Sequence, residues 1–320
     1  EILKVIPKEE LHKDTAIVLT DENLLTPLLH SLPESVEKVN VTMGYPIKNT
    51  LAYSLIEILV TLQTHCRAKD GATTFYHKDV AQLLSHPYIT DICGDVAREK
   101  IKEIATKRVI MVEDRLLNEA IKDKISGTTA EIERAKSILS KLFVDAKAIE
   151  LAQTDGEQEC GWKKLAHYIV DVLNTISALQ DFNEFDSDNY NNEHRLLVAN
   201  EITKLVNLIE ACKIPLSTEI FVSLLRRHLQ TISIPYEGKP LDGLQILGIL
   251  ETRNLDFKNV IILSMTDANF PGNHTSQASL IPYNLRFAYE MPTPEQHEAM
   301  YAYYFYRLLQ RAKRVNMLYC

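Results

Sequence analysis

Five short runs of apolar residues near the two ends of the chain constrain its fold more than any other feature. They lie at residues 15–19, 39–43, 244–250, 260–263 and 314–319. Runs that are apolar at nearly every position are typical of strands in a parallel sheet, which is covered on both faces. Neither end of the chain holds enough strands for a sheet of its own, so we expect the two ends to share one parallel sheet.

Apolar residues at three-to-four spacing predict that the middle of the chain is helical. A capping box with proline at the first helical position, Thr293-Pro294-Glu295-Gln296, predicts one further helix near the C-terminal end. The sequence therefore predicts an α/β domain at 1–50 and 240–320, interrupted by a large all-helical insertion at 51–239. The expected helices are 23–32, 51–62, 96–112, 132–151, 162–179, 195–212, 217–229 and 294–313.

Composition excludes several classes of protein. No stretch approaches the ~18 uninterrupted apolar residues of a membrane helix, so we expect no membrane partner. Only 10 of 320 residues are glycine, and the one P-loop-like spacing, 156–161, has Trp162 where the phosphate-binding lysine must stand.

The polar segment 181–193 lacks the glycine and the glutamate of a calcium loop, so we expect a solvated linker. A start at Glu1 rather than Met suggests a part of a longer protein.

Residue spacing gives no support for metal or nucleophilic chemistry. The 10 histidines form no HExxH motif, and GxSxG is absent. The five cysteines are widely spaced with no CxxC pair, which predicts reduced thiols of a cytoplasmic protein and no metal site.

Two groups of residues are candidates for ligand contact. Arg311 lies at the margin of the expected core face of helix 294–313, with Arg307 beside it; the group is either a solvated helix edge or an anion site. Arg253 and Asp256 lie in a polar turn between two buried strands, where they would face a phosphate and a hydroxyl, unless the turn is a simple surface connection. The net charge of −8 excludes a broad basic surface, although residues 241–320 are neutral.

Three segments, taken in order, resemble motifs of the C-terminal motor half of superfamily-one (UvrD-like) DNA helicases, and more closely the inactivated helicase-like region of AddB-type subunits of helicase–nuclease complexes. Residues 15–32 resemble motif IV, and residues 306–313 resemble motif VI, in which Arg311 matches the arginine that reaches the γ-phosphate. Residues 244–257, together with 260–265 and Phe270-Pro271, which follow them, resemble motif V. The resemblance implies a RecA-like sheet domain.

Several positions depart from the active helicase pattern. Thr20-Asp21 stands where the motif IV arginine is expected, Gly248 and Leu250 replace the threonine and histidine of motif V, and Asn254 replaces its glycine. Thr252-Arg253 in place of Ala-Lys is closer to the AddB pattern. We therefore expect no ATP hydrolysis by these residues alone and no cofactor in this part, with ATP and Mg²⁺ belonging to a longer protein.

The resemblance implies a DNA-holding scaffold acting in double-strand break repair and recombination. Its expected partners are DNA, single-stranded or at a duplex end, and a helicase–nuclease partner subunit. One alternative is the second motor half of an active ATP-dependent helicase, and another is a helical protein-interaction module. The nucleotide-facing candidates are Arg253, Asp256 and Arg311; the DNA-binding candidates are Thr42, Gly248 and Arg307.

Overall fold

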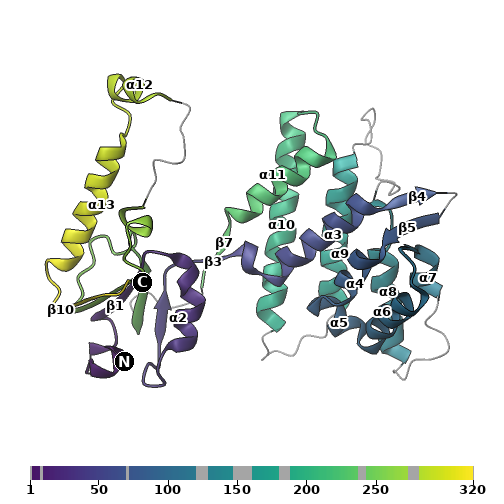
Figure 1. The fold of residues 1–320 in the computed structure, drawn as a ribbon, viewed down its shortest axis with the longest axis horizontal. Coiled ribbons are helices and arrows are strands. Elements are labelled where there is room, and N and C mark those ends of the chain that lie inside the picture. The colour runs from purple at the N-terminus through teal and green to yellow at the C-terminus, as the bar shows by residue number, and fades with distance from the viewer. Residues whose placement is uncertain are drawn as a thin grey trace. The chain divides into compact units, whose positions relative to one another are not determined.

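The computed structural model describes residues 2–7, 10–69, 72–119, 129–146, 161–179, 188–236, 243–272 and 281–319. The chain separates into two compact units (Figure 1). One unit combines Glu1–Tyr45 with Pro235–Cys320, and the other is Pro46–Ile234. We call them the sheet unit and the helical unit.

A five-stranded sheet forms the centre of the sheet unit. Its strand order is β10-β9-β1-β8-β2, and every neighbouring pair is parallel. The parallel sheet expected from the apolar runs is therefore confirmed. The strands are β1 (Thr15–Leu19), β2 (Val39–Val41), β8 (Leu244–Gly248), β9 (Asn259–Leu263) and β10 (Arg314–Met317).

Helices cover both faces of this sheet, which explains why its strands are apolar at consecutive positions. On one face, Ala16 and Val18 of β1 pack in a cluster with Leu308 of α13 (Pro294–Leu309). On the other face, Ile17 packs in a cluster with Leu25 of α2 (Leu25–Ser31). The remaining helices of the unit are α1 (Ile2–Val5), η2 (Glu22–Leu24), η5 (Ala268–Gly272) and α12 (Tyr283–Ala288).

Buried polar groups fix the register between β2 and β8. Asn40 donates from Nδ2 to Oε1 of Gln245 at 2.7 Å, and Gln245 donates from Nε2 to the carbonyl of Gly243 at 2.8 Å. Both amides are buried, so each needs its partner to offset the loss of water. Residues about 200 positions apart in sequence are thereby joined in one sheet.

The helical unit begins within β3 (Tyr45–Pro46) and ends with β7 (Ser233–Ile234), and these two strands pair with each other. Its core is one large cluster centred on side chains such as Leu59, Ile169 and Phe221. A three-stranded antiparallel sheet that the periodicity did not predict also belongs to it: β4 (Arg67–Lys69), β5 (Ala72–Tyr76) and β6 (Met111–Glu113). The helices are η3 (Ile47–Asn49), α3 (Leu51–His65), α4 (His77–Leu84), α5 (Pro87–Cys93), α6 (Asp95–Lys107), α7 (Asp114–Glu119), α8 (Thr129–Leu142), α9 (Gly161–Leu179), α10 (Asp188–Cys212) and α11 (Thr218–Gln230).

Several helix ends differ from the sequence expectation. The helix expected to reach 112 ends at Lys107, because Arg108 takes a left-handed conformation with φ 50° and the chain then enters β6. α13 ends at Leu309, four residues before its expected end, where the chain turns into β10. α10 begins at Asp188, inside the expected linker 181–193, of which 181–187 lies outside the described residues. Most of the P-loop-like spacing, 156–160, also lies outside them.

None of the helices in the described ranges is long and apolar enough to cross a membrane.

Candidate functional site

The loop between β8 and β9, residues 249–258, carries Arg253 and Asp256. The hydroxyl of Thr252 donates to the carbonyl three residues earlier at 2.6 Å, and the amide of Leu255 donates to the carbonyl of Thr252 at 3.1 Å. Asn254 takes the left-handed conformation with φ 61°, which asparagine tolerates better than most residues do. These contacts define a tight turn, and buried packing just after it holds the loop against the same face of the sheet as α13.

Asp256 lies between two arginines: Arg307 in the last turn of α13, and Arg311 in the turn that follows α13 rather than on the helix that was expected to reach 313. Arg307 donates from Nη1 to Oδ1 at 2.6 Å, and Arg311 donates from Nη1 to Oδ2 at 2.6 Å. The two guanidinium groups meet at this carboxylate although only Arg307 belongs to the helix. Hydrogen bonds from Arg307, and then from Arg311, hold the pKa of the Asp256 carboxyl below its ordinary value. Together the three charges amount to +1, so this cluster still attracts an anion.

The other arginine of the loop lies against an aromatic ring. The guanidinium of Arg253 is 5.4 Å from the ring centre of Tyr304 on α13, within the range of a cation–π contact. Between them opens a small pocket of about 180 Å³ that also reaches Arg307. Its remaining lining is Thr252, Asn254, Met300 and Tyr303.

Two large aromatic side chains of α13 face solvent beside these arginines. Tyr303 is 62% exposed and Tyr306 is 71% exposed. They border a second hollow of about 440 Å³, which Arg307 and Gln310 also line. We call this surface, formed by Arg253, Tyr303, Tyr306, Arg307 and Arg311, the tyrosine–arginine surface.

The structure does not bring all the candidate residues together. Thr42 directly follows β2, and Gly248 is the last residue of β8. Both therefore lie at the carboxyl ends of two neighbouring strands. Arg307 instead pairs with Asp256, which lies only three residues before the amino end of β9. Within the described ranges, no recorded contact joins Arg307 to Thr42 or Gly248. Arg253, Asp256, Arg307 and Arg311, by contrast, meet on one surface.

Sequence reasoning missed the tyrosines of this surface. The signal was present, because five of the six residues from 301 to 306 are aromatic. A helix packed on one face of a sheet buries only one side, so a run of this density must expose some of its rings. Tyr303 and Tyr306 are the exposed ones, whereas Leu308 is buried.

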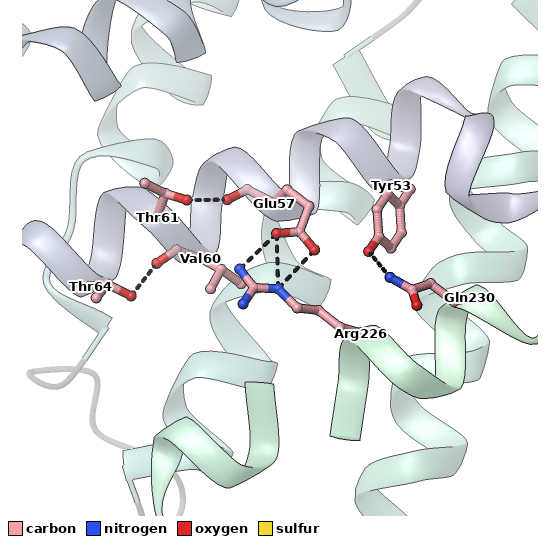
Figure 2. A network of polar contacts seen from close by, with 7 residues as sticks. All are labelled: Tyr53, Glu57, Val60, Thr61, Thr64, Arg226 and Gln230. Atoms are coloured by element: carbon pink, nitrogen blue, oxygen red, sulfur yellow. Dashed lines mark hydrogen bonds and ion pairs between the residues drawn. The ribbon is translucent and has the colours of Figure 1, made fainter. Parts of the chain in front are cut away.

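The helical unit has a polar network between α3 and α11 (Figure 2). Arg226 donates to Glu57 with two nitrogens, Nε at 3.0 Å and Nη2 at 2.7 Å, and Gln230 donates to the hydroxyl of Tyr53 at 3.2 Å. A cavity of about 810 Å³ lies next to this network, between α3, α9 and α11. The ion pair between Arg226 and Glu57 joins α11 to α3, so we assign the network a role in holding the two helices together.

Within the described ranges, no group of three or more His, Cys, Asp or Glu side chains is arranged to hold a metal ion. The chain matches no protein family and no curated protein.

Proposed function

We propose that the sheet unit binds single-stranded DNA and is an inactivated relative of the second motor domain of superfamily-one helicases, of the AddB type. Three segments that resemble motifs IV, V and VI support this assignment, because they occur in the helicase order. The parallel sheet that these segments share is compatible with a RecA-like domain interrupted by a helical insertion. In this proposal the protein holds DNA during recombinational repair of double-strand breaks.

The observation that carries the proposal is the tyrosine–arginine surface. Exposed rings that stand beside guanidinium groups suit single-stranded nucleic acid, because bases stack on the rings while phosphates contact the cations. Tyr303 and Tyr306 offer their rings, and Arg253, Arg307 and Arg311 offer cationic groups close by. The protein as a whole is acidic, so we expect this contact to be local and sensitive to salt.

A complete nucleotide site does not fit the residues present. The exposed guanidinium of Arg311 suits a phosphate contact, but Asp256, the residue expected to face a ribose hydroxyl, is engaged by two arginines. The sequence also holds no P-loop. We therefore assign the sheet unit a binding role, with no step that passes through ATP.

Fluorescence anisotropy with labelled oligothymidylate of about 20 nucleotides tests the proposal. We expect binding near 50 mM salt that weakens by about tenfold or more near 200 mM. The double variant Tyr303→Ala, Tyr306→Ala is expected to weaken binding by about tenfold or more, because each stacked base contributes roughly 1–3 kcal/mol.

Tyr289→Ala is the matched control, because this tyrosine is 72% exposed but lies beyond the N-terminal end of α13. It should leave binding unchanged. Absence of binding at low salt, or equal loss in both variants, would remove the tyrosine–arginine surface from the proposal.

A second candidate function is a motor half that assists an ATPase domain. The exposure of Arg311 favours it, because its side chain is 66% exposed despite the bond to Asp256. ATPase activity of the full-length protein that is lost on Arg311→Ala, with oligonucleotide binding retained, would decide for this candidate.

A third candidate function, docking of a helicase–nuclease partner by the helical unit, rests on the sequence prediction of an insertion. Retention of such a subunit by the helical unit alone, but not by the sheet unit, would favour it.

A further inference from the structure

The segment from Ile281 to Met300, which comprises α12 and the first part of α13, exposes a dense set of large apolar side chains. None of the α12 residues is buried. Figure 1 shows α12 at the end of α13 that lies away from β10, so it does not cover the sheet. The exposed apolar side chains and their exposed fractions are Ile281 (41%), Tyr283 (50%), Leu285 (48%), Phe287 (73%), Tyr289 (72%), Met291 (37%) and Met300 (37%).

Hydrogen bonds rather than a core hold this segment in shape. The guanidinium of Arg286 donates from Nη1 to the carbonyl of Pro292 at 2.9 Å, and the amide of Met291 donates to the carbonyl of Arg286 at 2.8 Å. The capping box at Thr293 then begins α13. These hydrogen bonds fix the backbone while the apolar side chains stay in water, so the segment presents a preformed contact surface, and exposed groups of apolar side chains mark sites of association.

The charge on this segment differs from that on the tyrosine–arginine surface. Residues 281–300 contain three glutamates, at 290, 295 and 298, and one arginine, at 286. Glu290 and Glu298 are exposed, and neither forms an ion pair with another of the described residues. Helix α13 is therefore acidic at its start and basic at its end. Phosphates and a second copy of the same acidic surface would both be repelled here.

We propose that Ile281–Met300 is a docking segment for a protein whose apolar cleft is rimmed by lysine or arginine. Phe287 and Tyr289 are the anchors, because they are the most exposed large apolar side chains of the segment and aromatic residues contribute strongly to the free energy of protein interfaces. Glu290 and Glu298 meet the basic rim and set the specificity. Residues 273–280, which precede the segment, could not replace such a partner. Leu280 is their only large apolar residue, and they contain no lysine or arginine.

Three labelled amphipathic peptides of equal length test the chemistry of the partner. One alternates leucine and lysine residues at helical spacing, one replaces its leucines with serine, and one replaces its lysines with glutamate. Anisotropy with the whole chain is expected to show binding of the leucine–lysine peptide alone. Binding of all three peptides, or of none, would overturn the proposal.

Two double variants then locate the site. Phe287→Ser with Tyr289→Ser, and Glu290→Lys with Glu298→Lys, are each expected to weaken binding of the leucine–lysine peptide by about tenfold or more. Tyr306→Ser is the control, because this tyrosine is 71% exposed on the basic part of α13. Circular dichroism checks that each variant is folded, which is expected since all four side chains are exposed. Unchanged peptide binding in both double variants overturns the site.

Two further measurements separate other occupants. Sedimentation of the wild-type chain and of the Phe287→Ser, Tyr289→Ser variant detects self-association, and a change of mass between them would assign the segment to a second copy. Loss of oligothymidylate binding in that variant, with binding retained in Tyr303→Ala, Tyr306→Ala, would assign it to nucleic acid. Either result overturns the proposal, and the sedimentation result does not depend on whether the tyrosine–arginine surface binds DNA.

Discussion

Asp256 sets the charge that the end of α13 presents, because its carboxylate is shared by Arg307 and Arg311. All three side chains are at least a quarter exposed, and exposed ion pairs contribute little to stability. The carboxylate therefore acts mainly on binding: it orients the two guanidinium groups and removes one unit of positive charge from the surface that we propose contacts phosphate.

Asp256→Asn is expected to tighten oligonucleotide binding by severalfold at low salt. The change raises the local charge by one and releases both arginines to phosphate, so the dependence of log Kd on log salt steepens by up to about 0.7 per added contact. Anisotropy titrations at several salt concentrations measure both effects. Glu37→Gln makes the same charge change in the exposed segment between α2 and β2 and should have little effect. Equal tightening in both variants would indicate a response to net charge alone.

His86 makes the helical unit sensitive to pH. Its ring is buried, and Nδ1 accepts a hydrogen bond from the amide of Tyr88 at 3.3 Å, as the N-cap of α5. Burial lowers the pKa of His86 to about 4, so the folded state keeps the ring neutral. The unfolded chain, with a pKa near 6.5, takes up a proton first as the pH falls. This contribution to stability is therefore complete above about pH 6.5, decreases toward pH 4 and is constant below it.

The loss over that range is at most about 3 kcal/mol. His86→Asn keeps a capping oxygen but removes the titration. Wild type loses stability as the pH falls from 6.5 to 4 and this variant does not. The free energy of unfolding of the variant minus that of wild type should therefore rise over this range. Urea denaturation at matched pH values measures the difference, and parallel curves for the two proteins would contradict the role of His86.

At the scale of elements, local signals predicted where helices and strands begin better than where they end. Ser217, the first residue of the expected helix 217–229, illustrates this, since it is the N-cap of α11 and its hydroxyl accepts a hydrogen bond from the amide of Ile220 at 3.3 Å. The end of α6 at Arg108 has no such signal, because a left-handed arginine depends on the packing of the β6 strand that follows. The three-stranded sheet was missed because its strands are short and only partly buried, and because β6 reaches β5 from beyond α4, α5 and α6.

Ser217→Ala is expected to lower the free energy of unfolding by about 1 kcal/mol, because an amide in the first turn of α11 loses its acceptor. Ser217→Asp keeps an acceptor and places a negative charge at the helix N-terminus, so it should retain most of the wild-type stability. Chemical denaturation monitored by circular dichroism compares the three proteins. Equal destabilisation by alanine and aspartate would show that the loss comes from packing rather than from the cap.

At the scale of the whole molecule, each unit has its own hydrophobic core. Every member of the large helical cluster lies within Pro46–Ile234, and the two clusters on the faces of the sheet contain only residues from the two ends of the chain. The sequence predicted the shared sheet because most positions of its strands are apolar. It did not predict the tyrosine–arginine surface, since which rings of α13 face solvent depends on how that helix packs on β1 and β9.

This division predicts different behaviour for three fragments of the chain. Pro46–Ile234 alone should give a helical spectrum and a cooperative unfolding transition, because its core is complete and its ends meet where β3 pairs with β7. Glu1–Tyr45 and Pro235–Cys320 should each be unfolded alone, because β1 inserts between β8 and β9 and neither piece can form the sheet by itself. When the two end fragments are mixed, they should associate and regain structure, as circular dichroism and size-exclusion chromatography would detect. An unfolded Pro46–Ile234, or an independently folded Pro235–Cys320, would contradict the shared sheet as the organising element of the molecule.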